Sequence, residues 1–130
     1  MKVRLLMIAM LIAGLCGCQR LPKGNLCIET GRGRTIDDRG VRQPRINALA
    51  QAQHDACLKI LRDVEAMPAG GSNLVGDYMA RNTLIGARVR SLVLSARQWR
   101  ERYLEDGTVE AELWINVDDV LRVVHEPTPN

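Results

Sequence analysis

The sequence contains no phenylalanine, and aromatic residues make up only 3% of its 130 residues. Proteins that bind single-stranded nucleic acid stack bases on aromatic side chains, so this scarcity disfavours that class. The formal net charge is only +3, which argues against a general polyanion binder, and we predict no nucleic-acid partner. The core must be built mainly from Leu, Ile, Val, Ala and Met, and the length suits one compact domain.

Histidine is also scarce, with two in the chain. The sequence shows no motif of metal-binding, nucleophilic or acid–base side chains. His54 and Cys57 lie three residues apart on a predicted helix, but zinc usually takes three or four protein ligands. A buried, unactivated thiol is inert as a nucleophile. The adjacent aspartates at 37–38 and 118–119 stand in no recognisable catalytic frame. We therefore predict no catalytic residue, no metal site and no cofactor, and expect that the protein is not an enzyme.

The longest apolar run lies at the N-terminus, where Lys2 and Arg4 precede residues 5–15. A positive start and a short apolar segment are typical of a secretory signal, and this run is too short to span a bilayer. We expect residues 1–17 to be a signal peptide that takes no part in the fold.

The end of this run, Leu15-Cys16-Gly17-Cys18, resembles a lipoprotein processing site. Leu15, Gly17 and Cys18 match the pattern, whereas Cys16 departs from the usual Ala or Ser. The resemblance implies acylation of Cys18 and, because several acyl chains insert together, stable anchoring in a lipid membrane. Gln19 is not the Asp that usually signals inner-membrane retention, which favours the outer membrane and a periplasm-facing domain. Ordinary secretion with a free Cys18 is the alternative.

Removal of Cys16 and acylation of Cys18 would leave Cys27 and Cys57 as the remaining cysteines. An oxidising periplasm favours a disulfide between them. Two separate buried thiols remain the alternative, because the sequence does not determine the distance between their Cα atoms.

The pattern along the chain predicts an α+β fold in which a helix layer packs on a small antiparallel sheet. We expect a lipid-anchored tether over 18–25, a single domain over 26–124 and a flexible tail over 125–130. A first strand at 26–30 precedes Gly31-Arg32-Gly33-Arg34, which is typical of a bulge or turn at a strand end and, as an alternative, of a phosphate-binding loop.

Helical periodicity follows from Pro44 to residue 67. Its predicted buried face consists of Ile46, Ala50, Gln53, Cys57, Ile60, Val64 and Met67, widened by Leu49, Ala56 and Leu61. Ser72 is suited to cap a second helical segment, and glycines predict a break within 74–91. Residues 92–94 have strand character, and Asp118 to Val124 have helical character.

A β-hairpin over residues 97–117 is the clearest local structure. Strict alternation of apolar and polar residues from Thr108 to Val117 predicts a half-buried strand. A three-residue loop with Gly107 in the left-handed conformation pairs Tyr103 with Val109, Arg102 with Glu110, Arg100 with Glu112 and Trp99 with Leu113. This register makes one face apolar and pairs opposite charges on the other.

Three features, in this order, carry a family resemblance: Gly31-x-Gly33, the Ala-rich helix 46–56 and the strand 106–111. Together they resemble the small lipoprotein family that includes the flagellar assembly protein FlgP and the N-terminal domain of FlgT. The resemblance covers nearly all of residues 26–117. It implies one α+β domain, no catalytic constellation and a role in envelope-anchored assemblies around the flagellar motor.

Partner contacts are predicted at Trp114, Arg32 and Arg34. Trp114 falls on the polar side of its strand, where a large ring is costly unless something covers it; that cover is either a partner or another part of the chain. Arg32 and Arg34 belong to an arginine-rich segment near the anchor that also includes Arg39, Arg42 and Arg45, and the alternative for it is a solvated loop.

The sequence therefore predicts a non-catalytic structural or assembly component of the cell envelope, with an envelope protein partner or self-association. A periplasmic small-ligand or cell-wall binding module is the alternative, which convergence of Arg32, Arg34 and Trp114 would favour. A hydrolase is the least favoured class and would need His54 to lie near Asp37 or Asp38.

Overall fold

The computed structural model describes residues 23–126. The predicted signal peptide, Cys18 and residues 127–130 of the predicted tail lie outside this range. The elements, in chain order, are β1 (Leu26–Arg34), α1 (Arg45–Glu65), β2 (Pro68–Gly70), β3 (Asn73–Leu74), α2 (Val75–Arg81), α3 (Thr83–Leu94), β4 (Arg97–Tyr103), β5 (Thr108–Asn116) and α4 (Val117–His125). The predicted α+β class is confirmed.

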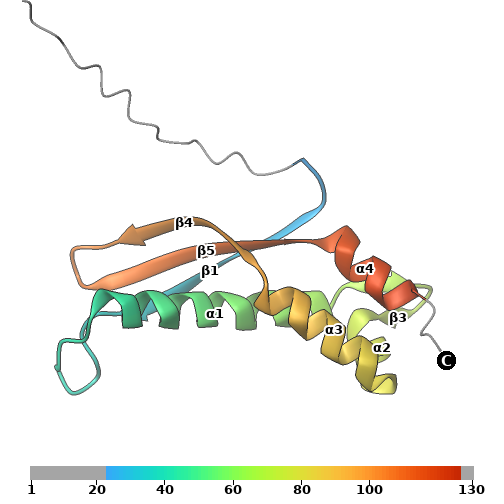
Figure 1. Ribbon diagram of the computed structural model, residues 1–130, viewed down its shortest axis with the longest axis horizontal. Helices are drawn as coiled ribbons and strands as arrows, with labels where there is room; N and C mark the ends of the chain where they lie inside the picture. Colours follow the sequence, from blue (N-terminus) through green and yellow to red (C-terminus); the bar gives the residue numbers. More distant parts are fainter. Residues whose placement is uncertain (1–22, 127–130) are drawn as a thin grey trace, which may run out of the picture.

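The main sheet has three antiparallel strands in the order β1-β5-β4. Helix α1 runs along one face of this sheet, and α2, α3 and α4 gather at the end where β5 leads into α4 (Figure 1). Strands β2 and β3 form a separate small hairpin after α1. The strand order makes β5 the central strand and leaves β1 and β4 as the two edges.

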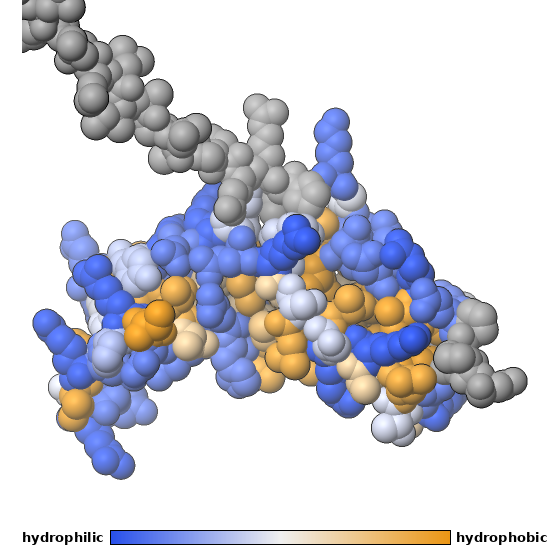
Figure 2. All heavy atoms as spheres, in the orientation of Figure 1, coloured by the Kyte–Doolittle hydropathy of each residue, from blue (hydrophilic) through white to orange (hydrophobic). Residues whose placement is uncertain are grey.

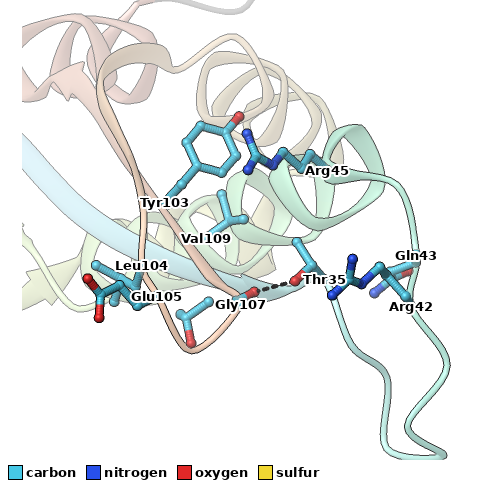
Figure 3. A pocket seen from close by; sticks show the side chains of 10 residues that line it. Thr35, Arg42, Gln43, Arg45, Tyr103, Leu104, Glu105, Gly107 and Val109 are labelled. Carbon is cyan, nitrogen blue, oxygen red and sulfur yellow. Dashed lines mark hydrogen bonds between the residues drawn. The ribbon is translucent and has the colours of Figure 1, made fainter.

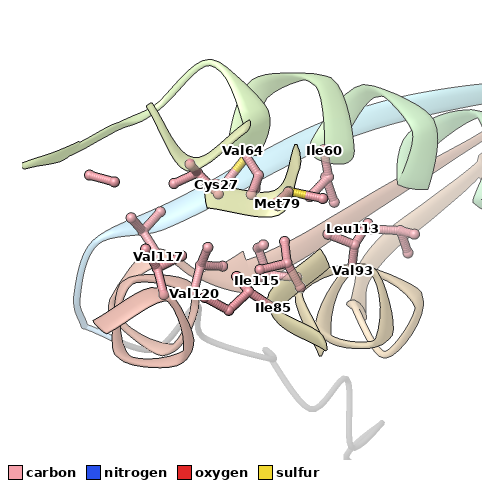
Figure 4. Packing of buried hydrophobic residues seen from close by; sticks show 14 of the residues in the cluster. Cys27, Ile60, Val64, Met79, Ile85, Val93, Leu113, Ile115, Val117 and Val120 are labelled. Atoms are coloured by element: carbon pink, nitrogen blue, oxygen red, sulfur yellow. The ribbon is translucent and has the colours of Figure 1, made fainter. Parts of the chain in front are cut away.

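Strand β5 has the predicted two-residue alternation. Val109, Ala111, Leu113 and Ile115 are buried on the α1 side of the sheet. Leu113 and Ile115 join the main hydrophobic core, which Figure 4 shows between α1, the smaller helices and the sheet. Val109 and Ala111 form a second buried cluster with Ala48 and Ala52 of α1. Along α1 the core is therefore divided into a small alanine-rich cluster and a larger cluster with bulkier side chains.

The β4–β5 hairpin has the predicted loop and most of the predicted register. Gly107 has φ +83°, and the N–H of Leu104 donates to the carbonyl oxygen of Thr108 (2.9 Å) across a three-residue loop. Arg102 lies opposite Glu110. Three of the four predicted pairs are present.

The fourth pair, Trp99 with Leu113, is wrong. A β-bulge between Gln98 and Arg100 shifts the register, so Gln98 lies opposite Leu113. The amide of Gln53 on α1 donates to Gln98 (2.7 Å), which ties this part of β4 to the helix. The bulge adds one residue to β4, which an argument from alternation alone does not detect.

Gly31 and Gly33 lie within β1, and this corrects the predicted turn after residue 30. A Cβ added to Gly31 would lie 1.8 Å from the carbonyl oxygen of Ala52, and one added to Gly33 would lie 1.8 Å from that of Ala48. The strand and helix backbones therefore approach as closely as glycine allows.

The buried face of α1 matches the prediction at Ala56, Ile60 and Val64 but differs in the first half of the helix. There Ala48 and Ala52 are buried, whereas Ile46 is 72% exposed. The prediction followed the large apolar side chains. Because β1 presents glycines, the helix instead turns its small side chains toward the strand.

The region after α1 differs from prediction in its helix ends. Ser72 caps no helix; the Asp77 carboxylate accepts from the N–H of Leu74 (2.7 Å) at the start of α2. The predicted break is present at Asn82, whose side chain accepts from the N–H groups of Leu84 and Ile85. Residues 92–94, predicted as strand, are the end of α3.

The predicted helical character of Asp118 to Val124 is confirmed, and α4 extends it by one residue at each end. His125, predicted as the start of the tail, is the last residue of the helix. The His125 ring lies edge to face with Tyr78, with 5.9 Å between ring centres, so α4 packs beside α2. Within residues 23–126, no helix combines the length and apolar character needed to cross a bilayer.

Candidate functional site

The face of the main sheet that points away from α1 is the principal candidate surface, and we call it the open face. Side chains alternate along a strand, and Gly31 and Gly33 lie against α1, so the alternate residues of β1 point the other way. The strand register then places on the open face Ile28, Thr30, Arg32, Arg34, Arg97, Arg100, Arg102, Glu110, Glu112 and Trp114. Both predicted arginines and the predicted tryptophan share this face.

A buried carboxylate joins all three strands of the open face. Glu110 on β5 is only 6% exposed and accepts from Nε of Arg32 on β1 (3.2 Å) and from a terminal nitrogen of Arg102 on β4 (2.6 Å). A buried carboxylate is costly unless it is paired, and two guanidinium groups meet that need. This cluster aligns the strands and leaves both arginine side chains more than half exposed.

The open face carries excess positive charge. Its strands contribute five arginines and two glutamates. The second glutamate, Glu112, pairs with Nε of Arg100 at 3.7 Å. Each guanidinium has five N–H donors, so Arg100 and Arg102 retain donors for a further acceptor.

Trp114 lies at the other end of the open face and is partly covered by the chain itself. The guanidinium of Arg97 lies 5.9 Å from its ring centre, a cation–π distance. The ring also lines a hollow of about 400 Å³ with Leu92, Ser95 and Asp119. The surface beside it is partly apolar, because Ile28 lies opposite Trp114 and is 41% exposed.

Arg32, Arg34 and Trp114 do not line one pocket. Arg32 and Arg34 line a hollow of about 270 Å³ with Asp38 and Gln43, separate from the hollow at Trp114. Trp114 lies four residues along β5 from Glu110, the residue opposite Arg32, so within residues 23–126 these side chains do not converge as a small-ligand module would require.

A further hollow of about 430 Å³ lies at the hairpin turn (Figure 3). The Arg45 guanidinium stacks over the Tyr103 ring, 5.2 Å from its centre. The Thr35 hydroxyl donates to the carbonyl oxygen of Gly107 (2.9 Å), which joins the loop after β1 to the hairpin. Arg42 lines the same hollow, so the predicted arginine segment is divided between the open face and this end of the molecule.

The aspartate pair at 37–38 has a structural role. The Asp37 carboxylate accepts from the N–H groups of Arg39 (2.9 Å) and Val41 (2.8 Å) and so shapes the loop between β1 and α1. Asp38 is fully exposed and lies 3.8 Å from Arg34. No hydrogen bond or ion pair links His54 to either aspartate within the described chain.

Figure 2 shows hydrophilic side chains over much of the surface, with hydrophobic patches at the hairpin-turn end and from the middle of the molecule to the end that holds α2, α3 and α4. At the hairpin-turn end the exposed large apolar residues include Ile36, Val41, Ile46, Tyr103 and Leu104. Arginines 39, 42 and 45 are interspersed among them, so no large continuous apolar patch forms there.

Cys27 and Cys57 are free thiols in the structure, so the predicted disulfide is not formed and the alternative of two separate thiols holds. The Cys57 sulfur lies 3.6 Å from the carbonyl oxygen of Val93. Burial, with the negative charges of Asp63 and Glu29, raises the pKa of Cys27 to about 11, and burial also raises the pKa of Cys57. Both thiols are therefore protonated at neutral pH and poorly nucleophilic.

Metal binding finds no support in the part of the chain that is described. No group of three or more His, Cys, Asp and Glu side chains within residues 23–126 is arranged to hold a metal ion. His54 is exposed on α1 and makes no hydrogen bond to Cys57.

Sequence reasoning missed how α1 side chains cover the edge of β1. The Asp55 carboxylate accepts from the N–H of Arg32 (2.9 Å), and Nζ of Lys59 donates to the carbonyl oxygen of Thr30 (2.8 Å). Gln51 accepts from the N–H of Arg34 (3.4 Å). These three polar residues recur every four positions beside the alanine face, and that spacing was the available signal.

Comparison with known proteins adds little. No known family model matches the chain, and no solved structure matches it. Over 52 aligned residues it is 42% identical to cytochrome P450 monooxygenase bet2 from Neocamarosporium betae, a match that covers 35% of this chain and 10% of that protein. The chain thus spans about a tenth of that protein, and so short a match shows no family. The resemblance to FlgP and FlgT stays a prediction.

Proposed function

We propose that this protein is an outer-membrane lipoprotein, anchored through acylated Cys18 and facing the periplasm, that acts by binding and assembly without catalysis. The observation that carries the proposal is the one-sided sheet. Helix α1 packs on one face, while the open face presents arginines, glutamates and a tryptophan. The resemblance to FlgP makes flagellar assemblies one setting for this function.

The composition of the open face supports partner binding. Arginine and tryptophan are enriched among the residues that dominate protein interfaces. Trp114 is half-buried under Arg97, and Ile28 opposite it is exposed. A partner that covered this end of the face would bury apolar area there. It would not need to break the ion pairs of Glu110.

The anchor is tested by comparing the full chain with its Cys18→Ser variant. Intact-mass measurement and membrane fractionation should find an acylated, membrane-bound wild type and an unmodified, soluble variant. An unmodified wild type outside the membrane fraction would remove the lipoprotein part of the proposal.

The binding face is tested in cells by photo-crosslinking. A photoreactive amino acid at Ile28, on the open face, should give a covalent adduct, whereas the same group at the exposed His54 of α1 should not. The mass of the adduct separates a second copy of this chain from a different protein. Absence of an adduct at Ile28, in a cell where the protein is folded and anchored, would contradict the assembly role.

A further inference from the structure

The two edges of the main sheet differ in how their backbone groups are satisfied. On the β1 edge, side chains of α1 bond the outward N–H groups of Arg32 and Arg34 and the outward carbonyl of Thr30. Gln43 donates to the carbonyl oxygen of Arg34 (2.6 Å). Within residues 23–126 no side chain bonds the backbone of β4 in this way. Residues 30–34 of the β1 edge are therefore closed to a new strand, whereas the β4 edge is open.

The pairing groups on β4 belong to two residues. The N–H of Leu104 bonds the carbonyl oxygen of Thr108 on β5. Hydrogen-bonded pairs alternate along an antiparallel ladder, so Glu101 and Tyr103 direct their N–H and C=O groups away from β5. The bulge between Gln98 and Arg100 confines regular pairing to the stretch from residue 100 onward.

The side chains of β4 indicate the charge of the strand that would bind. Arg100 and Arg102 project on the open face. Each forms an ion pair with the glutamate directly opposite on β5, Glu112 and Glu110 respectively. Both arginines remain about half exposed, at 53% and 51% of their side chains. A strand added on the outer side of β4 would place its own side chains next to the same two guanidinium groups.

We propose that the edge of β4 binds an extended, acidic segment of a partner protein, which adds a fourth strand to the sheet. The proposal rests on the binding function proposed above and names its partner chemistry. The bound segment carries carboxylates at alternate positions, opposite Arg100 and Arg102, and uncharged residues between them, opposite Glu101 and Tyr103. Backbone hydrogen bonds hold the strand, and the arginines select its charge.

A second copy of this chain is a poorer occupant of the same edge. Antiparallel pairing of two β4 strands about Arg102, the register that pairs Glu101 with Tyr103, would place the arginines of both copies on one face, with Arg102 opposite itself. Like charges directly opposite one another destabilise a strand pair. The arginine row therefore opposes self-pairing and attracts an acidic strand.

The test uses the full chain in detergent and a fluorescent peptide, Thr-Val-Glu-Thr-Glu-Val-Thr, with binding measured by anisotropy. A matched peptide with lysine in place of glutamate should bind at least about tenfold more weakly, because charge complementarity is lost. In a third peptide the central threonine and both valines are N-methylated, which removes the N–H groups that face β4. This peptide should also bind about tenfold more weakly or worse. N-methylation of the glutamates themselves, whose N–H groups face away, should have little effect.

Two variants of one residue separate edge pairing from simple charge attraction. Glu101→Pro removes an outward N–H that β5 does not use, whereas Glu101→Ala removes the same carboxylate and keeps the N–H. Edge pairing predicts weaker binding by Glu101→Pro and unchanged or tighter binding by Glu101→Ala. Arg88→Gln, on α3, is the control for loss of an arginine elsewhere, and circular dichroism checks that each variant is folded.

Several outcomes would overturn the inference. Equal binding by both N-methylated peptides, or by both Glu101 variants, would place the acidic peptide on the open face and not on the edge. Binding of phosphatidylglycerol vesicles without binding of the peptide would assign the arginines to lipid headgroups. An adduct at Ile28 in cells with no peptide binding would leave the proposed function standing and reject the β4 edge alone.

Discussion

Replacement of Gly33 by alanine tests the closest contact in the fold. The added Cβ would lie 1.8 Å from the carbonyl oxygen of Ala48 and 3.0 Å from the backbone nitrogen of Ala52. Carbon and other heavy atoms pack at about 3.5 Å, so α1 must withdraw from β1 by roughly 1.7 Å. Both contacts are to helix backbone, and no side-chain rotation relieves them.

The loss of folding stability follows from the gap that this withdrawal opens between α1 and the sheet. Ala48, Ala52, Val109 and Ala111 form a cluster with no exposed surface, and a gap of 0.5–1 Å already loses about a quarter to a half of each contact's attraction. Overpacking typically costs about 1–3 kcal/mol, and a backbone clash belongs at or above the top of that range. We expect Gly33→Ala to lose at least about 3 kcal/mol, which lowers the melting temperature by roughly 12 °C or more for a domain of this size.

Urea and thermal unfolding followed by circular dichroism measure this loss. Arg34→Ala is the matched control on the same strand, because its side chain is 69% exposed and its ion-pair partner Asp38 is 99% exposed. We expect the control to lose about 1 kcal/mol or less. If Gly33→Ala unfolds at the same temperature as Arg34→Ala, the close approach of β1 and α1 is wrong.

Three further predictions concern helix capping and pH. Asn82→Ala should lower the free energy of unfolding by about 1 kcal/mol in urea titrations, because it removes the acceptor for the first N–H groups of α3. Burial opposes ionisation of Asp55, but hydrogen bonds from Lys59 and the backbone of Arg32 lower its pKa overall, so its carboxylate stabilises the fold above about pH 4 and loses that effect as pH falls further. Stability curves of Asp55→Asn and wild type should therefore converge in acid; a constant gap would contradict this. A hydrogen bond with Asp63 raises the pKa of Glu29. Protonated Glu29 therefore stabilises the fold below about pH 4.3, and this stabilisation is lost as the pH rises through the raised pKa. Glu29→Gln should lose less stability than wild type between pH 4 and 7, and parallel curves would refute the raised pKa of Glu29.

Local patterns in the sequence were sufficient for much of the fold. Alternation from Thr108 onward predicted β5 and its buried side, and Gly107 with two opposite-charge pairs predicted the loop and the register beside it. These features depend on neighbours within one hairpin, where spacing and charge act over a few residues. The bulge at Gln98 escaped the same reasoning because an inserted residue leaves no mark in the alternation.

The candidate site depended on contacts distant in sequence. The sequence indicated Arg32, Arg34 and Trp114 as contact residues, and all three lie on the open face. That Glu110 is buried between Arg32 and Arg102 required β1 and β4 to flank β5, an order that no local pattern contains.

By itself, the sequence determined the class of fold, the hairpin and its charge pairing, because these follow from periodicity and short-range chemistry. The tertiary structure alone decided which face is buried in the first half of α1 and which edge of the sheet is free. Both follow from one fact, that Gly31 and Gly33 let the helix backbone settle against β1. This contact turns the alanines inward and brings Asp55 and Lys59 onto the β1 edge, and it leaves β4 as the edge open to a partner.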